Sequence, residues 1–395
     1  MSIRAIRPLS PRNPTELHRA STTLELLFDL VSVIAIAAVT AGLHHAISEG
    51  HGIAALPGFI LLFLAIWWAW MNFTWFASAF DNDDALYRIL VLVIMCGALI
   101  FAAGAGSIFR TLDFSFGLLG WIVMRAGMIG LWLRAAGSQR HRTTALRYAG
   151  GIAFAQILWT TFYFITAPGS SSFFLLSALC FLVEWSVPPF AESANKTPYH
   201  RHHLIERYGL LMIISLGEIM LSVSAGFGLL FSDHPTADAA VTALSALIIV
   251  FALWWVYFCE AEHLPRADAG AAFLWGYGHV LIFCATAVTG AAIGAEVDLA
   301  SHHSQVTQAE VARYLGLALA VLHLVLWVIR DRLLPLPAAR RLALPAMATA
   351  FALAALAGLP AWAFALLSIV TVWWRAPVTG VAAAGPGKDD HGRPT

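Results

Sequence analysis

Residues 24–47 read LELLFDLVSVIAIAAVTAGLHHAI, and this stretch decides the class of the protein. It is apolar over nearly its whole length, and about 20 such residues let a helix cross the hydrocarbon core of a bilayer. Similar runs recur along a chain of 395 residues that is 59% hydrophobic and only 12% charged, with a mean hydropathy of +0.75. Soluble proteins carry about 25% charged residues. The sequence therefore predicts an all-α, polytopic membrane protein.

Twelve runs are long enough to be transmembrane helices. They are 24–47, 55–79, 86–108, 114–136, 146–167, 172–190, 207–231, 238–260, 270–294, 312–330, 342–358 and 360–375. The last two form either two spans or one re-entrant hairpin. With the N-terminus in the cytoplasm, all but three of the 23 Lys and Arg fall in segments on the cytoplasmic side, as the positive-inside rule expects. The exceptions are Arg110, Arg125 and Arg313.

The two halves of the chain resemble each other. The segment IWWAW at 66–70 is similar to LWWVY at 253–257, and an acidic cluster follows each one. This pattern predicts two tandem six-helix repeats related by an axis along the membrane normal. The alternative is that aromatic-rich membrane helices share a composition. The expected organisation is a cytoplasmic segment 1–20, a first repeat 21–190, a cytoplasmic linker 191–206, a second repeat 207–375 and a disordered cytoplasmic tail 376–395.

Charge and cysteine content exclude several functions. Lys+Arg 23 against Asp+Glu 23 leaves no net charge, so no basic footprint for nucleic acid is present. The four cysteines lie within apolar runs, without the spacing of a disulfide framework or a zinc site. No catalytic motif, metal site or cofactor-binding motif is found, so we expect neither cofactor nor metal. The expected partners are the lipid bilayer and an unknown small ion or solute.

Ionisable residues within spans are functional candidates because an unpaired charge is expensive in a membrane. Glu218 lies near the middle of its span, and Ser215 and Ser222 share its helix face. This polar face fits a wet cavity or ion path. The alternative is a helix-locking ion pair, for which Arg125 is the expected partner.

Glu25 and Asp29 share one face at the start of the first span. Helix capping is the favoured role for Glu25. Asp29 lies deeper with Ser32 beside it, which makes it a candidate for a site or for a structural contact. Glu184 is expected at the membrane interface. Solvated positions are expected for the loop histidines His200, His202, His203 and His263, and for the acidic residues Asp81, Asp83 and Asp84.

Three ordered motifs resemble the bacterial low temperature requirement protein A (LtrA) family. The first is ELLFDLV at 25–31, the second is Trp68-Ala69-Trp70 with the acidic cluster downstream, and the third runs from HLIERYG at 203–209 to LGE at 216–218. The residues that carry the resemblance are Glu25, Phe28, Asp29, Trp68, Asp83, Asp84, Glu206, Arg207, Gly209, Gly217 and Glu218. The chain departs from the family pattern at Leu27, Ser32, Ile34 and Ile219. The resemblance implies a multi-spanning bacterial inner-membrane protein, linked by name to growth in the cold, and no known substrate.

Three functions remain open at this point. The leading hypothesis is a transporter or channel-like protein whose site lies between the two halves, lined by the Asp29 face and the Glu218 face. The second is a non-transporting structural or sensory membrane protein. The third, a membrane-embedded enzyme acting on lipid at the acidic cytoplasmic edge, has no metal-ligand pattern to support it, so we expect no enzymatic activity.

Overall fold

The computed structural model describes residues 8–13, 20–231, 236–260 and 269–376, and the regular structure within these ranges is helical. The α-helices are α1 (Thr23–Ser48), α2 (Gly52–Ala79), α3 (Ala85–Thr111), α4 (Ser115–Ala135), α5 (Arg142–Ile165), α6 (Ser171–Glu192), α7 (Arg201–Gly228), α8 (Ala237–Phe258), α9 (Ala269–Ala300), α10 (Gln308–Ile329), α11 (Ala338–Leu356) and α12 (Ala361–Arg375). The short 3₁₀ segments η1 (Gln139–His141), η2 (Leu229–Phe231) and η3 (Asp331–Leu333) join or extend them.

The helices confirm a polytopic membrane protein. In the described part of the chain, 11 helices are long and apolar enough to cross a bilayer, and α12 is a shorter apolar helix. Large apolar side chains such as Phe154, Leu182 and Leu353 are more than half exposed on the outer surface. Such a surface suits lipid, because hydrocarbon chains cover apolar side chains without penalty.

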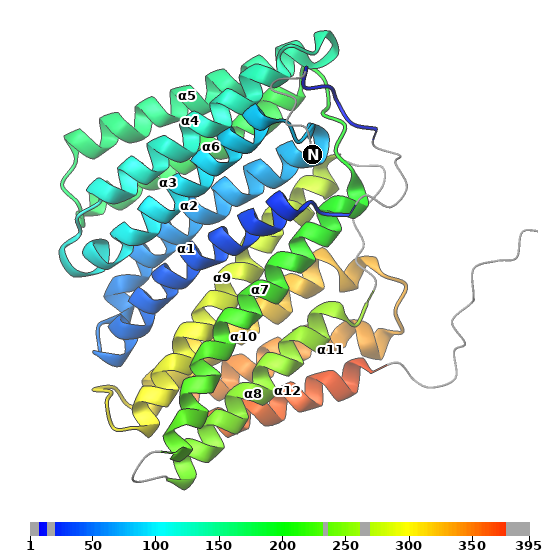
Figure 1. The fold of residues 1–395 in the computed structure, drawn as a ribbon. Coiled ribbons are helices and arrows are strands. Elements are labelled where there is room, and N and C mark those ends of the chain that lie inside the picture. Colours follow the sequence, from blue (N-terminus) through cyan, green and yellow to red (C-terminus); the bar gives the residue numbers. More distant parts are fainter. Residues whose placement is uncertain (1–7, 14–19, 232–235, 261–268, 377–395) are drawn as a thin grey trace, which may run out of the picture.

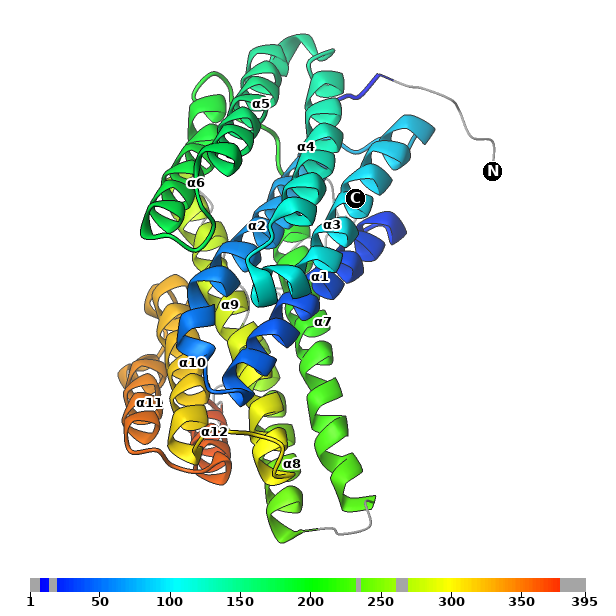
Figure 2. The same ribbon diagram turned by 90° about the vertical axis from the view of Figure 1, so that its left-hand side faces the viewer.

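Three helices occupy the centre of the molecule. Helices α1, α7 and α9 lie side by side, with α2–α6 on one side and α8 and α10–α12 on the other (Figures 1 and 2). Gly290 of α9 lies between Ile219 of α7 and Thr40 of α1, so that the three backbones approach closely. All three begin at the same end of the bundle.

Helices α11 and α12 form an antiparallel hairpin, and whether both cross the membrane stays a prediction. At one end, Arg340 donates a hydrogen bond to the carbonyl of Arg375 at 3.0 Å, and Arg375 donates one to the carbonyl of Arg340 at 3.1 Å. At the other end, the turn residue Gly358 lies against Ala309 at the start of α10. The side chain of Arg375 also pairs with Glu260 at 3.1 Å and Asp331 at 3.2 Å, which fixes the end of α12.

The two aromatic segments that predict a repeat have different surroundings. Trp67, Trp68 and Trp70 are buried at the centre of the molecule, whereas Trp254 and Trp255 are about half exposed (48% and 49%) on the outer surface. The tandem repeat stays a prediction.

Candidate functional site

Glu25 lies at the start of α1 and does more than cap the helix. Its carboxylate accepts a hydrogen bond from the backbone N–H of Thr22 at 2.8 Å, and the Thr22 hydroxyl accepts one from the Glu25 N–H at 3.2 Å. The predicted cap is therefore present as a reciprocal capping box. The same carboxylate also lies 3.0 Å from Nε2 of His203 and 3.2 Å from the guanidinium of Arg207, both on α7.

Asp29 lies one helical turn further along α1 and binds the same arginine. Arg207 donates two hydrogen bonds to the Asp29 carboxylate, at 3.0 and 2.5 Å, which is a bidentate arrangement. The indole N–H of Trp70 on α2 donates a third, at 2.6 Å. Asp29 and Arg207 are 0% exposed. Asp29 therefore belongs to a buried ion pair and does not face a wet cavity.

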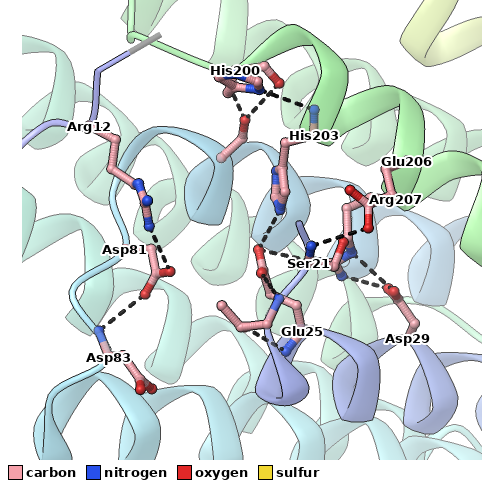
Figure 3. Close-up of polar contacts among 12 residues, drawn as sticks. Arg12, Ser21, Glu25, Asp29, Asp81, Asp83, His200, His203, Glu206 and Arg207 are labelled. Carbon is pink, nitrogen blue, oxygen red and sulfur yellow. Dashed lines mark hydrogen bonds and ion pairs between the residues drawn. The ribbon is translucent and has the colours of Figure 1, made fainter. Parts of the chain in front are cut away.

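The five residues Glu25, Asp29, Trp70, His203 and Arg207 form what we call the central network (Figure 3 shows its charged members). The network joins α1, α2 and α7, and it contains residues from all three predicted motifs. Arg207 contacts both carboxylates, and His203 is a second partner of Glu25, so neither buried carboxylate lacks a partner inside the membrane. Its geometry is that of a helix lock.

Other motif residues surround the central network. Phe28 stacks on Phe73, with the ring centroids 4.1 Å apart, and the guanidinium of Arg207 lies 5.9 Å from the Phe73 ring. Gly209 is buried on α7, two residues after Arg207. Glu206 accepts a hydrogen bond from the backbone N–H of Ser21 at 3.2 Å, which ties the segment before α1 to α7.

Arg125 does not pair with Glu218, so that predicted partner is wrong. The guanidinium of Arg125 on α4 lies 2.9 Å from the carboxylate of Glu184 on α6 and 4.1 Å from the ring of Trp121. The indole N–H of Trp68 donates to the other Glu184 oxygen at 2.9 Å. Glu184 is therefore buried, not interfacial, because Arg125 of α4 and Trp68 of α2 surround its carboxylate with internal partners.

Glu218 lies instead in a small cavity between α1, α7 and α9, which we call the Glu218 cavity. Its volume is about 90 Å³. Polar lining groups come from all three helices: Thr40, His44, Ser215, Glu218, Ser222 and Thr286. Among the described residues, the half-buried Glu218 carboxylate has neither a hydrogen-bond nor an ion-pair partner. The predicted polar face of α7 therefore does line a cavity.

Two hydroxyl groups of this cavity are oriented as acceptors. Thr40 donates its hydroxyl hydrogen to the carbonyl of Ile36 at 2.9 Å, and Thr286 donates to the carbonyl of Ile282 at 2.9 Å. Their oxygen lone pairs remain for a ligand. The lining includes no Lys or Arg. The Glu218 cavity is thus suited to a small cation or a proton and unsuited to an anion.

Ser32 is not part of this cavity. Its hydroxyl donates to the carbonyl of Phe28 at 2.8 Å and is buried in the helix packing. Asp29 itself is also absent from the lining, but Val33 and Ile36, which continue the Asp29 face of α1, line the cavity together with the Glu218 face. The aromatic residues Trp70, Tyr208 and Phe283 lie at the border between the central network and the cavity.

The opposite end of the cavity leads to a polar group that sequence reasoning missed. His44, which lines the cavity, lies 2.8 Å from the carboxylate of Asp298, and the Ser48 hydroxyl donates to the same carboxylate at 2.7 Å. His44 and Asp298 are 254 residues apart, so no local spacing signalled the contact.

The acidic segment between α2 and α3 is structural, and only one of its three carboxylates is largely solvated. Asp84 is buried, caps α3 by accepting from the Tyr87 N–H at 2.8 Å, and pairs with Arg134 at 2.6 Å. Asp83 forms an exposed pair with Arg88, and Asp81 pairs with Arg12 (Figure 3). These pairs explain the cluster without a metal, and the described residues contain no group of three or more metal-ligating side chains.

Two of the loop histidines are buried. His203 contacts Glu25, and the His200 ring accepts from the His203 backbone N–H at 3.2 Å and so caps α7. His263 lies outside the described residues. The prediction of solvated loop histidines is wrong for His200 and His203 because α7 begins at Arg201, within the segment predicted as a linker.

Comparison with known proteins identifies the family. The family model for the bacterial low temperature requirement A protein matches residues 20–376. The chain belongs to this family. The chain is also similar to an uncharacterized protein of Rhizobium meliloti (strain 1021). The two sequences are 24% identical over 328 residues, which cover 79% of this chain and 78% of the relative. No solved structure matches the chain. The low temperature requirement A match includes both the central network and the Glu218 cavity.

Proposed function

We propose that this protein is a transporter or channel-like protein of the bacterial inner membrane that passes a small cation or protons. The N-terminus would be cytoplasmic, and the permeation site would be the Glu218 cavity, at the interface between two six-helix halves. The observation that carries the proposal is an unpaired carboxylate in a cavity that also presents the acceptor oxygens of Thr40 and Thr286. The proposal assigns the protein no enzymatic step.

The surroundings of the cavity support a route that is closed at one end. Towards the end at which α1 begins, the aromatic residues Trp70 and Phe283 and the central network separate the cavity from the surface. Towards the other end, the carboxylate of Asp298, which accepts from His44 and Ser48, adds a further acceptor group. With the predicted orientation, the cation would enter from the periplasmic side, and the central network would be the closed inner gate.

Flux measurements on proteoliposomes test this function. Purified protein is reconstituted, and a membrane potential and a pH gradient are imposed while an enclosed pH dye and a potassium dye report flux. Glu218→Gln removes the charge but keeps the size, so we expect it to lower flux at least about tenfold, which corresponds to ~1.4 kcal/mol in the barrier. Replacing external small cations with N-methylglucamine separates proton flux from cation flux.

Glu49→Gln is the matched control, because Glu49 is an exposed carboxylate just after α1. Its flux should equal that of the wild-type protein. Equal flux through wild-type and Glu218→Gln proteins, or wild-type flux no higher than that of protein-free vesicles, would refute the proposal.

The second candidate is a structural or sensory membrane protein. It is favoured by the burial of the central network, in which the family-motif residues are fully paired and inaccessible. It predicts a folded, correctly inserted protein that shows no flux under any gradient.

A further inference from the structure

A second cavity, separate from the Glu218 cavity, lies at the end of the bundle where α2 and α6 end. Its volume is about 260 Å³, and its lining comes from α2, α4, α5, α6, α9 and the segment 196–199. We call it the aromatic cavity. It is smaller than the pockets of about 300–1,000 Å³ that hold drug-sized ligands, so it suits a small molecule.

Aromatic rings form two walls of this cavity. On one side, the ring of Trp75 lies 5.0 Å from that of Tyr199 and 6.3 Å from that of Phe273, measured between centroids. On the other side, Trp132 stacks on Tyr148 at 3.9 Å. The faces of such rings carry partial negative charge and attract cations.

A carboxylate lies at the second wall. Glu192, the last residue of α6, accepts hydrogen bonds from the Tyr148 hydroxyl at 2.9 Å, the Thr197 N–H at 2.8 Å and the Thr197 hydroxyl at 2.8 Å. All three donors are neutral, so they orient the carboxylate without cancelling its charge. In the described part of the chain Glu192 has no ion-pair partner, and Lys196, at the cavity rim, is exposed.

The phenol of Tyr199 adds no second charge. Burial, and secondarily the nearby Glu192 carboxylate, raise the pKa of Tyr199 above its ordinary value. The cavity therefore has aromatic walls and one carboxylate held against the second wall, with the exposed ammonium of Lys196 at its rim. A metal ion would need several oxygen ligands to replace its water, and an anion would be repelled by Glu192.

We propose that the aromatic cavity binds a small organic cation with a methylated ammonium group, held by the aromatic walls and by Glu192. A methylated ammonium is weakly hydrated and spreads its charge over apolar methyl groups, so aromatic faces can replace its water. The proposal does not depend on permeation through the Glu218 cavity, because the two cavities share no lining residue.

Calorimetric titration of the purified full chain with choline tests the proposal. The comparison ligand is 3,3-dimethylbutan-1-ol, which has nearly the same shape as choline and no charge. We expect choline to bind and the neutral analogue to bind at least tenfold more weakly. Absence of choline binding to the folded wild-type protein, or equal binding of the two ligands, would overturn the proposal.

Two variants locate the site. Glu192→Gln removes the charge and keeps a carbonyl acceptor for Tyr148 and Thr197, and Phe273→Leu removes one ring of the first wall. Both should weaken choline binding at least tenfold, while Phe154→Leu, which removes a lipid-exposed ring, should leave it unchanged. Thermal unfolding and size-exclusion chromatography establish that each variant is folded. Unchanged choline affinity in the folded Glu192→Gln variant would contradict the assignment.

The same group occurs in free solutes and in lipid headgroups. Titrations in nanodiscs of phosphatidylcholine and of phosphatidylglycerol distinguish these sources. If choline binds more weakly in phosphatidylcholine nanodiscs than in phosphatidylglycerol nanodiscs, the lipid headgroup competes for the site. If choline binds equally in both, the site takes a free solute. Binding that is abolished by Glu192→Gln in both nanodiscs supports the proposed site in either case.

Discussion

Arg207 is the residue on which the central network depends, because it is the cation shared by Glu25 and Asp29. Replacing it with Gln would leave two buried carboxylates without their arginine. Breaking a buried ion pair from one side costs about 3–5 kcal/mol. We therefore expect Arg207→Gln to lower the thermal midpoint in detergent sharply, as measured by tryptophan fluorescence. The exposed Arg313 supplies the control, and Arg313→Gln should leave the midpoint unchanged.

The indole of Trp70 is the second donor to Asp29, and Trp70→Phe isolates its contribution. The substitution keeps a buried ring and removes one charge-assisted hydrogen bond, which is worth about 1.5–3 kcal/mol. We expect a midpoint between those of wild type and Arg207→Gln. Because both groups bind the same carboxylate, the double variant should be less destabilised than the sum of the single variants. Strict additivity would show that the two contacts are independent.

Individual residues were predictable as candidates, but their partners were not. The cost of an unpaired charge in a membrane singled out Asp29, Arg125 and Glu218 from the sequence alone. Which charge meets which depends on how helices pack, and Asp29 and Arg207 are 178 residues apart. The sequence therefore predicts Glu218 as the partner of Arg125, whereas α4 packs against α3 and α5 and its arginine meets Glu184 of α6.

Between elements, the pair of Arg125 and Glu184 joins α4 to α6. The single variant Arg125→Met should destabilise the protein by about 3–5 kcal/mol, because Glu184 loses its cation. Adding Glu184→Gln should recover most of the lost stability, since the amide oxygen can still accept a hydrogen bond from Trp68. Thermal unfolding of the single and double variants measures the effect. If Glu218→Gln restored the stability of the Arg125→Met variant equally well, the pairing of Arg125 with Glu184 would be wrong.

Helices α3 and α4 meet at two glycines. A Cβ added at Gly120 would lie 2.6 Å from the carbonyl oxygen of Gly97 and 2.6 Å from the N of Phe101, and backbone cannot yield as a side chain can. We expect Gly120→Ala to destabilise the protein by about 1–3 kcal/mol through overpacking. Gly150→Ala is the control, because that position in α5 opens onto free space. Equal thermal midpoints for the two variants would show that α3 and α4 can move apart to accommodate the extra methyl group without a loss of stability.

The elements themselves were largely predictable, and the exceptions have one cause. Every predicted span overlaps a helix, because apolar runs of this length leave no other backbone state in a membrane. Hydropathy reports only the part of a helix that meets lipid. It therefore missed the polar ends of α7 from Arg201 and of α9 up to Ala300, and these ends carry His203 and Asp298.

At the scale of the whole molecule, the orientation and the number of crossings are testable together. Helix α12 has 15 residues and rises about 22 Å, which is short for a transmembrane helix. However, the turn that joins it to α11 lies against the start of α10. We expect Leu359→Cys, in a background without native cysteines, to react with a membrane-impermeant maleimide from the periplasm. Ser304→Cys should react likewise, and Arg341→Cys should not. Protection of Leu359→Cys from external reagent would indicate a re-entrant hairpin.

The separation of Asp29 from Arg207 along the chain has a consequence for how the protein is made. Ribosomes add roughly 5–20 residues per second, so the 178 residues between the two take roughly 10–35 s to synthesise. During that interval α1 has already left the ribosome, with Glu25 and Asp29 lacking the arginine that neutralises them. The central network can therefore form only after α7 has been synthesised.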